Sequence, residues 1–185
     1  YQNYGSSYGA NGPMFISNNE IRILSSSSTS YGLYCYQNSQ FDVFHNSIYV
    51  KGTSTCYGAY FYQNSTSYKT NFKNNIIHMH STSSQRPIYF GSTNFSTSYC
   101  TLDYNNYYTT GGSTNYYGTT TYNTLSSWQT ACGQETNSTT LTLSYLDLNK
   151  SMELSDYTGL TCLQVSGVTK DIRNNNRAST CYKGC

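Results

Sequence analysis

Short stretches of alternating apolar and polar residues recur through the first 110 residues of the chain. "NNEIRI" at 18–23 is followed by "HNSIYV" at 45–50, "NNIIHM" at 74–79 and "YNNYYT" at 104–109. In each stretch an asparagine precedes side chains that alternate with a period of two, and the stretches recur about every 27–30 residues. The alternation with a period of two is typical of a β-strand with one buried face. The pattern therefore predicts a repeat built from short strands.

Aligning the four stretches produces columns of equivalent residues. Parallel coils stacked at the strand spacing of about 4.8 Å would place the members of a column directly over one another. The expected core columns are Ile16, Val43, Phe72 and Leu102, and Ile21, Ile48 and Ile77; the asparagine column is Asn19, Asn46, Asn75 and Asn105. We expect these asparagines at a corner of each coil, in the left-handed conformation that asparagine tolerates, with their amides hydrogen-bonded to one another.

A second repeat lies between the copies of the first. "YGLYCYQNS" at 31–39 matches "YGAYFYQNS" at 57–65, and "RPIYFGS" at 86–92 is a looser copy. Strand alternation turns Leu33, Ala59 and Ile88 to one side and tyrosines to the other. The expected surface aromatic ladder is Tyr34, Tyr60, Tyr89, Tyr36 and Tyr62, with Tyr49 on another face beside Arg22 and His78. Three interpretations stay open: the rings bind sugars, they pack against another protein chain, or they are strand residues half-covered by loops.

The fold class follows from the repeat length. Each repeat has room for two or three short strands and lacks the long period-3.6 stretches of helical solenoids, which predicts an all-β parallel β-helix of about four coils. Residues 1–110 are expected to form the coils and 111–185 a C-terminal coil or cap region. "YNTLSSWQTACGQ" at 122–134 predicts a short helix near 124–132, capped by Asn123 or Thr124 and ended by Gly133. "NYGSSYGAN" at 3–11 is a degraded repeat copy, so the chain is expected to begin partway round a coil.

Three C-terminal stretches occur in a recognisable order: "DYNNYYTTGG", "YYGTTTYNTLSSWQTACGQETNS" and "LSDYTGLTCLQVSGVTKDIRNNNR". This order resembles the ending of secreted bacterial right-handed β-helix repeat proteins of the pectate-lyase-like superfamily. "DIRNNNR" is similar to an Asp-Ile-x-Gly-x-x-Arg turn of that family, with asparagine in place of the glycine, and "CYKGC" replaces the family's Gly-Ala-x-Glu ending. The resemblance implies a right-handed coil and the C-terminal part of a large exported surface or secreted protein, and it implies no particular reaction.

Composition and charge limit the kinds of partner that the chain is expected to have. The 185 residues include 22 Tyr and seven Cys, only 10% are charged, and the net charge is +2. Because there is neither a Lys/Arg run nor an apolar stretch of about 20 residues, we expect no nucleic-acid partner and no membrane span. Scattered cysteines without a CxxC pair predict disulfides in an oxidising compartment, and Cys162 is expected to pair with Cys181 or Cys185.

Candidate chemistry is sparse, and no catalytic residue, cofactor or metal is expected. The eight acidic residues do not stack at matching repeat positions, so the paired carboxylates of glycosidases are not predicted. His78 and His80 share one face of a strand, but no third metal ligand accompanies them.

The sequence as a whole predicts a non-enzymatic extracellular structural or adhesive module at the cell surface. Its expected partners are copies of itself, stacked into a surface fibre, or a larger parent surface protein. The alternative is a carbohydrate-binding module with glycans as partners, or a non-catalytic piece of a polysaccharide-degrading β-helix enzyme.

Overall fold

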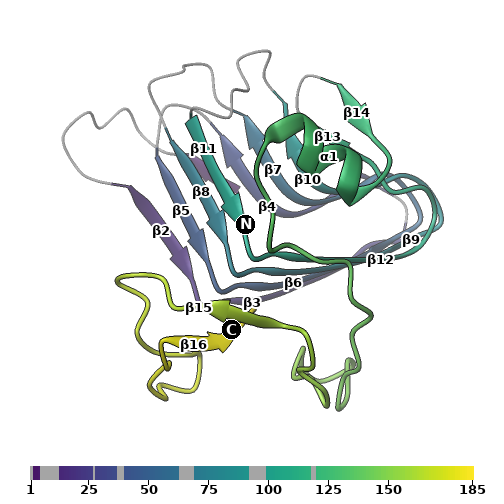
Figure 1. The fold of residues 1–185 in the computed structure, drawn as a ribbon. Helices are drawn as coiled ribbons and strands as arrows, with labels where there is room; N and C mark the ends of the chain where they lie inside the picture. Colours follow the sequence, from purple (N-terminus) through teal and green to yellow (C-terminus); the bar gives the residue numbers. More distant parts are fainter. Residues whose placement is uncertain are drawn as a thin grey trace.

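The computed structural model describes residues 2–4, 13–26, 28–36, 40–62, 69–91, 99–117 and 120–185; most of the degraded copy expected at 3–11 lies outside them. Apart from a two-stranded sheet near the C-terminus, strands in these segments form three sheets, named A, B and C here (Figure 1). Sheet A contains β1 (Gln2–Tyr4), β4 (Ser30–Tyr36), β7 (Cys56–Tyr62), β10 (Gln85–Phe90), β13 (Tyr116–Tyr117) and β14 (Thr121–Tyr122). Sheet B contains β2 (Met14–Ser17), β5 (Phe41–Phe44), β8 (Thr70–Lys73) and β11 (Cys100–Asp103). Sheet C contains β3 (Glu20–Leu24), β6 (Ser47–Gly52), β9 (Ile76–Ser81) and β12 (Asn106–Gly111).

The chain visits the three sheets in turn. Strands β1, β2 and β3 lie in sheets A, B and C, and each later set of three returns in the same order as far as β12. Neighbouring strands within a sheet are parallel up to β13. The predicted all-β chain of stacked parallel strands is therefore confirmed, and the arrangement is compatible with a parallel β-helix.

Equivalent apolar residues of successive coils lie opposite one another. The columns are Ile16, Val43, Phe72 and Leu102 in sheet B, and Ile21, Ile48, Ile77 and Tyr107 in sheet C. Members from the two middle coils have no exposed surface, whereas Ile16 and Ile21 of the first coil are half-buried. Each coil thus covers the apolar side chains of its neighbours, which is how a thin core can be closed without long apolar segments.

The helix α1 (Leu125–Cys132) forms within the range expected from the sequence. Thr124 is its N-cap and accepts from the Ser127 N–H, while Gly133 ends it with a left-handed φ of 63°. Trp128 is fully buried and lies 6.3 Å from the Phe90 ring and 5.8 Å from the Tyr122 ring. The helix therefore covers the apolar end of the last coil (Figure 1).

Residues 139–185 lie alongside the coils rather than across their end (Figure 1). Leu143, Met152, Leu154 and Leu160 form a second apolar cluster with Ile76 and Tyr49 of sheet C. Tyr49 was expected on an exposed aromatic surface, and that prediction is wrong, because this cluster leaves only 7% of Tyr49 exposed. The segment also forms an antiparallel pair, β15 (Thr161–Leu163) and β16 (Thr180–Tyr182). Among the described residues, no helix is long and apolar enough to cross a membrane.

Candidate functional site

The outer face of sheet A carries rows of stacked tyrosines. Leu33, Ala59 and Ile88 point inward and are buried, so the residues beside them in β4, β7 and β10 point outward. The rings of Tyr34 and Tyr60 are 4.8 Å apart and nearly parallel, and those of Tyr60 and Tyr89 are 4.9 Å apart. Further stacked pairs are Tyr31 with Tyr57 at 4.7 Å and Tyr36 with Tyr62 at 5.2 Å. Because the strands are in register, identical side chains meet face to face.

Stacking determines what this tyrosine face offers to a partner. Tyr60 has Tyr34 against one ring face and Tyr89 against the other, and the Tyr57 ring meets it edge-on at 5.3 Å. A sugar ring stacks on an aromatic face, and both faces of Tyr60 are already covered. Burial and the neighbouring phenols raise the pKa of Tyr60, so its hydroxyl remains protonated at neutral pH. The row therefore presents mainly ring edges and neutral hydroxyl groups.

Arg86 adds a cation to the tyrosine face. Its guanidinium carbon lies 5.2 Å from the centre of the Tyr57 ring and 5.0 Å from that of Tyr89. Its Nη1 donates a 2.8 Å hydrogen bond to the Tyr57 hydroxyl. These contacts hold the guanidinium close to both rings, as in cation–π pairs.

The asparagine column is a continuous chain of hydrogen bonds. The Nδ2 of Asn19 donates to Oδ1 of Asn46 at 2.9 Å, Asn46 to Asn75 at 3.0 Å, and Asn75 to Asn105 at 3.1 Å. The same Oδ1 atoms accept the backbone N–H of the preceding asparagine. The column thus joins all four coils and is fully buried at Asn46, Asn75 and Asn105, which favours one fixed stacking register.

The left-handed residue at this corner is not the column asparagine, so that part of the prediction is wrong. Positive φ falls on the residue just before it, in the row Asn18, His45, Asn74 and Tyr104. The column asparagine instead aligns its backbone N–H and its amide with the next coil, while the residue before it makes the turn. His45 and Tyr104 occupy a strained region that favours glycine or asparagine.

Glu135 ends the asparagine column and was not identified from the sequence. It is fully buried, accepts from the Tyr107 hydroxyl at 2.5 Å and from Asn105 Nδ2 at 3.1 Å, and is hydrogen-bonded to Ser138. Burial raises the pKa of Glu135 to about 7, although the hydrogen bonds oppose the shift. Lys183 is buried nearby, where it donates to Asn137 O and Thr139 Oγ1, and burial lowers its pKa to about 8.

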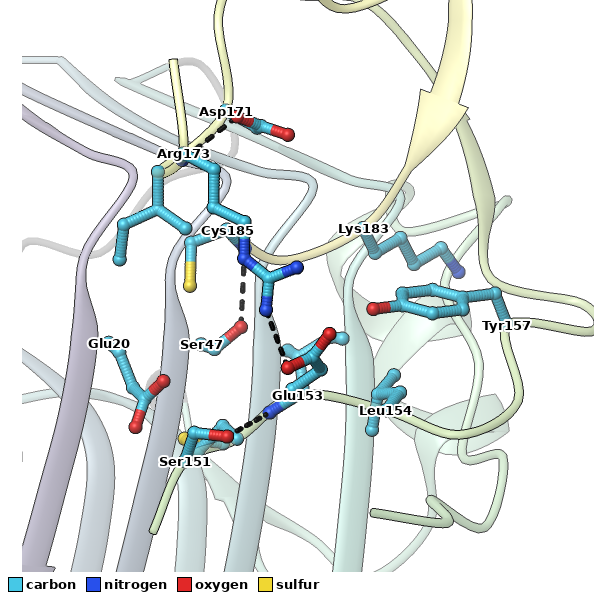
Figure 2. Close-up of a pocket in the computed structure, with 13 residues that line it drawn as sticks. Glu20, Ser47, Ser151, Glu153, Leu154, Tyr157, Asp171, Arg173, Lys183 and Cys185 are labelled. Carbon is cyan, nitrogen blue, oxygen red and sulfur yellow. Dashed lines mark hydrogen bonds and ion pairs between the residues drawn. The ribbon is translucent and has the colours of Figure 1, made fainter. Parts of the chain in front are cut away.

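A pocket of about 340 Å³ lies between sheet C and the C-terminal segment (Figure 2). Three carboxylates line it, from Glu20, Glu153 and Asp171. Figure 2 shows Arg173 reaching across to Glu153, with which it forms a 2.5 Å ion pair. Asp171 accepts hydrogen bonds from the backbone N–H of Arg173 and of Asn175. Two of the three acids are therefore used to hold the C-terminal loop, and Glu20 faces them from the first coil.

The two histidines of "HMH" are each tied to a hydroxyl group. His78 Nδ1 lies 2.9 Å from the Tyr145 hydroxyl, and His80 Nδ1 lies 2.8 Å from Thr110 Oγ1. Burial lowers the pKa of His78 to about 4, so it is neutral at physiological pH. The pair acts in packing against neighbouring strands and the C-terminal segment.

The seven cysteines are free thiols, so the expected disulfide of Cys162 with Cys181 or Cys185 is not formed in this structure. Cys35, Cys56, Cys100 and Cys132 are buried among the apolar side chains of the main core, where thiols behave as small hydrophobic groups. Cys162 lies opposite Cys181 across β15 and β16, with 3.5 Å between their Sγ atoms. Cys185 instead lines the pocket between sheet C and the C-terminal segment, and its backbone N–H donates a hydrogen bond to Ser47 Oγ.

Comparisons of the chain with protein-family models, with curated proteins and with solved structures gave no match. Its function is therefore inferred from the geometry of its own side chains.

Proposed function

We propose that this chain is a non-enzymatic structural or adhesive module of an extracellular protein, built as a right-handed parallel β-helix of the pectate-lyase-like type. Its contact surface is the tyrosine face of sheet A, and its partner is a second copy of the same face. The stacked row through Tyr60 carries this proposal. Ring edges and neutral hydroxyls, repeated at the coil spacing, suit a partner surface with the same repeat.

The carboxylates support a structural role rather than hydrolysis. A glycosidase needs two carboxyl groups free to face one substrate. Here most acids are engaged by nearby groups: Asp42 by Asn71, Asp103 by Asn137, Asp147 by Lys150, Glu153 by Arg173, and Asp171 by Asn175. Glu135 is enclosed by its hydrogen-bond partners. These hydrogen bonds and ion pairs give the six carboxylates a structural role in loops and corners of the fold.

Glycan binding is the second candidate, supported by the same aromatic surface. It is less favoured because the faces of the inner rings are covered by one another. Sugars would have to bind at ring edges and hydroxyl groups, where stacking adds nothing.

Self-association tests the proposal directly. Sedimentation velocity of the wild-type chain should show a monomer–dimer equilibrium that shifts toward the dimer as concentration rises, because a contact between two identical faces closes at two copies. The double variant Tyr34→Ser/Tyr60→Ser should remain monomeric with an unchanged circular dichroism spectrum, while Lys51→Ser, at an exposed position of sheet C, should assemble like the wild type. A wild-type chain that is monomeric at every concentration would contradict the proposal.

Two further assays separate the alternatives. Binding on a glycan array that is lost in Tyr34→Ser/Tyr60→Ser would identify the carbohydrate-binding function instead. New reducing ends or unsaturated products from a polysaccharide panel would show that the chain is an enzyme.

A further inference from the structure

Three metal-ligating side chains converge where the C-terminal segment meets the second coil. His45 comes from the corner between β5 and β6, and Cys162 and Cys181 come from β15 and β16. One ligand atom from each residue lies within 4.8 Å of the other two, and all three side chains are mostly buried. These residues are far apart in the sequence, so their convergence is a product of the fold.

The polar atoms around His45 are incompletely satisfied. Its Nε2 lies 2.9 Å from Asn74 Nδ2, while its Nδ1 is buried without a hydrogen-bond partner. The backbone of Tyr182 and Gly184 lies near the ring without meeting hydrogen-bond geometry at Nδ1. The Oδ1 of Asn74 is likewise buried and unpartnered. Buried polar atoms without a partner are rare and costly, and a ligand bound at Nδ1 would supply the missing partner there.

We propose that His45, Cys162 and Cys181 bind a thiophilic closed-shell cation, with Zn²⁺ as its representative. Thiolate and imidazole are the ligands that this class of ion prefers, and three protein ligands leave a fourth position for water. Zinc–sulfur bonds of about 2.3 Å in a tetrahedral site place two sulfurs about 3.8 Å apart. The observed separation of 3.5 Å is close to that spacing.

Zinc binding at this site would release protons from the two thiols and move one proton on the His45 ring. Each thiol loses its proton to solvent, so one Zn²⁺ releases two protons and forms a neutral unit with the two thiolates. Because Nε2 now accepts from Asn74, the neutral ring carries its proton on Nδ1. Binding through Nδ1 moves that proton to Nε2, and the Asn74 amide turns so that its unpartnered Oδ1 accepts it; the turn exchanges the Asn74 Nδ2 bond to Leu163 O for this bond to the imidazole. Asn74 is therefore a positioning residue for the site.

The site would fasten the C-terminal segment to the coils. The equivalent corner residues of the other coils are Asn18, Asn74 and Tyr104, so an imidazole occurs in this row only at His45, next to the two cysteines. Without the ion, Asn74 donates to Leu163 O at 2.7 Å, which brings β15 to the same corner. A bound ion would join His45 of this corner to β15 and β16 through coordinate bonds to Cys162 and Cys181.

Zinc uptake by the reduced 185-residue chain tests the proposal. We expect one Zn²⁺ per chain by elemental analysis after dialysis, an upward shift of the thermal unfolding midpoint, and Cys162 and Cys181 shielded from alkylation. His45→Asn, which carries the residue of the neighbouring coils, should lose stoichiometric binding, as should Cys162→Ser. Cys185→Ser is the matched control and should bind like the wild type.

Other outcomes would overturn the site. They are reduced protein that takes up no zinc, binding that His45→Asn leaves unchanged, or zinc bound equally well by the Cys162→Ser/Cys181→Ser double variant. A Cys162–Cys181 disulfide that persists in peptide maps of protein purified with zinc present would also overturn it, since the two sulfurs cannot be both bonded to each other and thiolate ligands.

Discussion

Removing one amide from the middle of the asparagine column should destabilise the fold far more than removing one at its end. Asn75 is fully buried, and its Oδ1 accepts both the N–H and the Nδ2 of Asn46. Its Nδ2 donates to Val43 O and to Asn105 Oδ1. Asn75→Ala therefore removes four hydrogen bonds and leaves the N–H of Asn46 buried without that acceptor.

The magnitude follows from the groups left behind. A buried donor or acceptor that loses its partner costs about 1–3 kcal/mol. With Asn46 N–H and Val43 O both affected, Asn75→Ala should lower the free energy of unfolding by about 2–6 kcal/mol. Asn19→Ala is the matched control, because Asn19 is exposed and lies at the outer end of the column. Its loss should cost about 1 kcal/mol or less.

Urea unfolding followed by circular dichroism measures both values, with unchanged slopes showing that the unfolded state is the same. Equal losses for the two variants would refute the argument, because they would mean that position in the column has no effect. A loss below about 1 kcal/mol for Asn75→Ala would do the same, since an amide worth so little cannot hold the coils in register.

Three further predictions concern the core, the coil spacing and pH. Phe61→Ala should lower the unfolding free energy by about 3–5 kcal/mol in the same assay, because this core side chain is 1% exposed. Gly58→Ala should lower the thermal midpoint, since a Cβ there would lie 2.5 Å from Pro87 O and 2.4 Å from Ile77 Cγ2; an unchanged midpoint would show that the coils can separate without cost. Burial raises the folded-state pKa of Glu135 from 4.5 to about 7, so its contribution is greatest below about pH 4.5 and is lost as pH rises through 7, by roughly 3 kcal/mol. Glu135→Gln should flatten this decline in a series of urea titrations between pH 4.5 and 8, and an equal slope in both proteins would contradict it.

The repeated part of the fold could be predicted because stacked parallel strands require the same kind of residue at the same position of every coil. The columns through Val43 and Asn46 were visible as intervals in the sequence, and the in-register pairs place them as neighbours. Tyr60 was visible for the same reason. Periodicity does not reveal dihedral angles, which is why the left-handed turn was placed one residue too late.

Non-repeating contacts could not be predicted in this way. Tyr49 matched the pattern of an outward strand residue, and nothing in its neighbourhood showed that Leu160 would pack against it. Glu135 and His45 gain their chemistry from residues that no interval connects to them. A thiol that fills an apolar column, such as Cys35, looks the same in sequence as one awaiting a disulfide. The close approach of neighbouring strands in sheet A, by contrast, had a signal in the sequence. The "YG" that opens two copies of the second repeat marks Gly32 and Gly58, where added Cβ atoms would meet backbone oxygens of the next strand.

Departures from the repeat are informative about which faces of the coils are already occupied. At the corner row the residue type changes from coil to coil, and these residues contact the C-terminal segment individually: Asn18 donates to Lys170 O, and Asn74 to Leu163 O. A segment without a repeat needs a different partner at each coil, so it selects different side chains there. On sheet A the outward tyrosines keep the same identity through three coils and stack in register. A surface selected to meet a repeating partner would have this property, because every coil then makes the same contact. This contrast between the two faces is the physical reason to place the proposed self-association on sheet A and the proposed cation site at the corner.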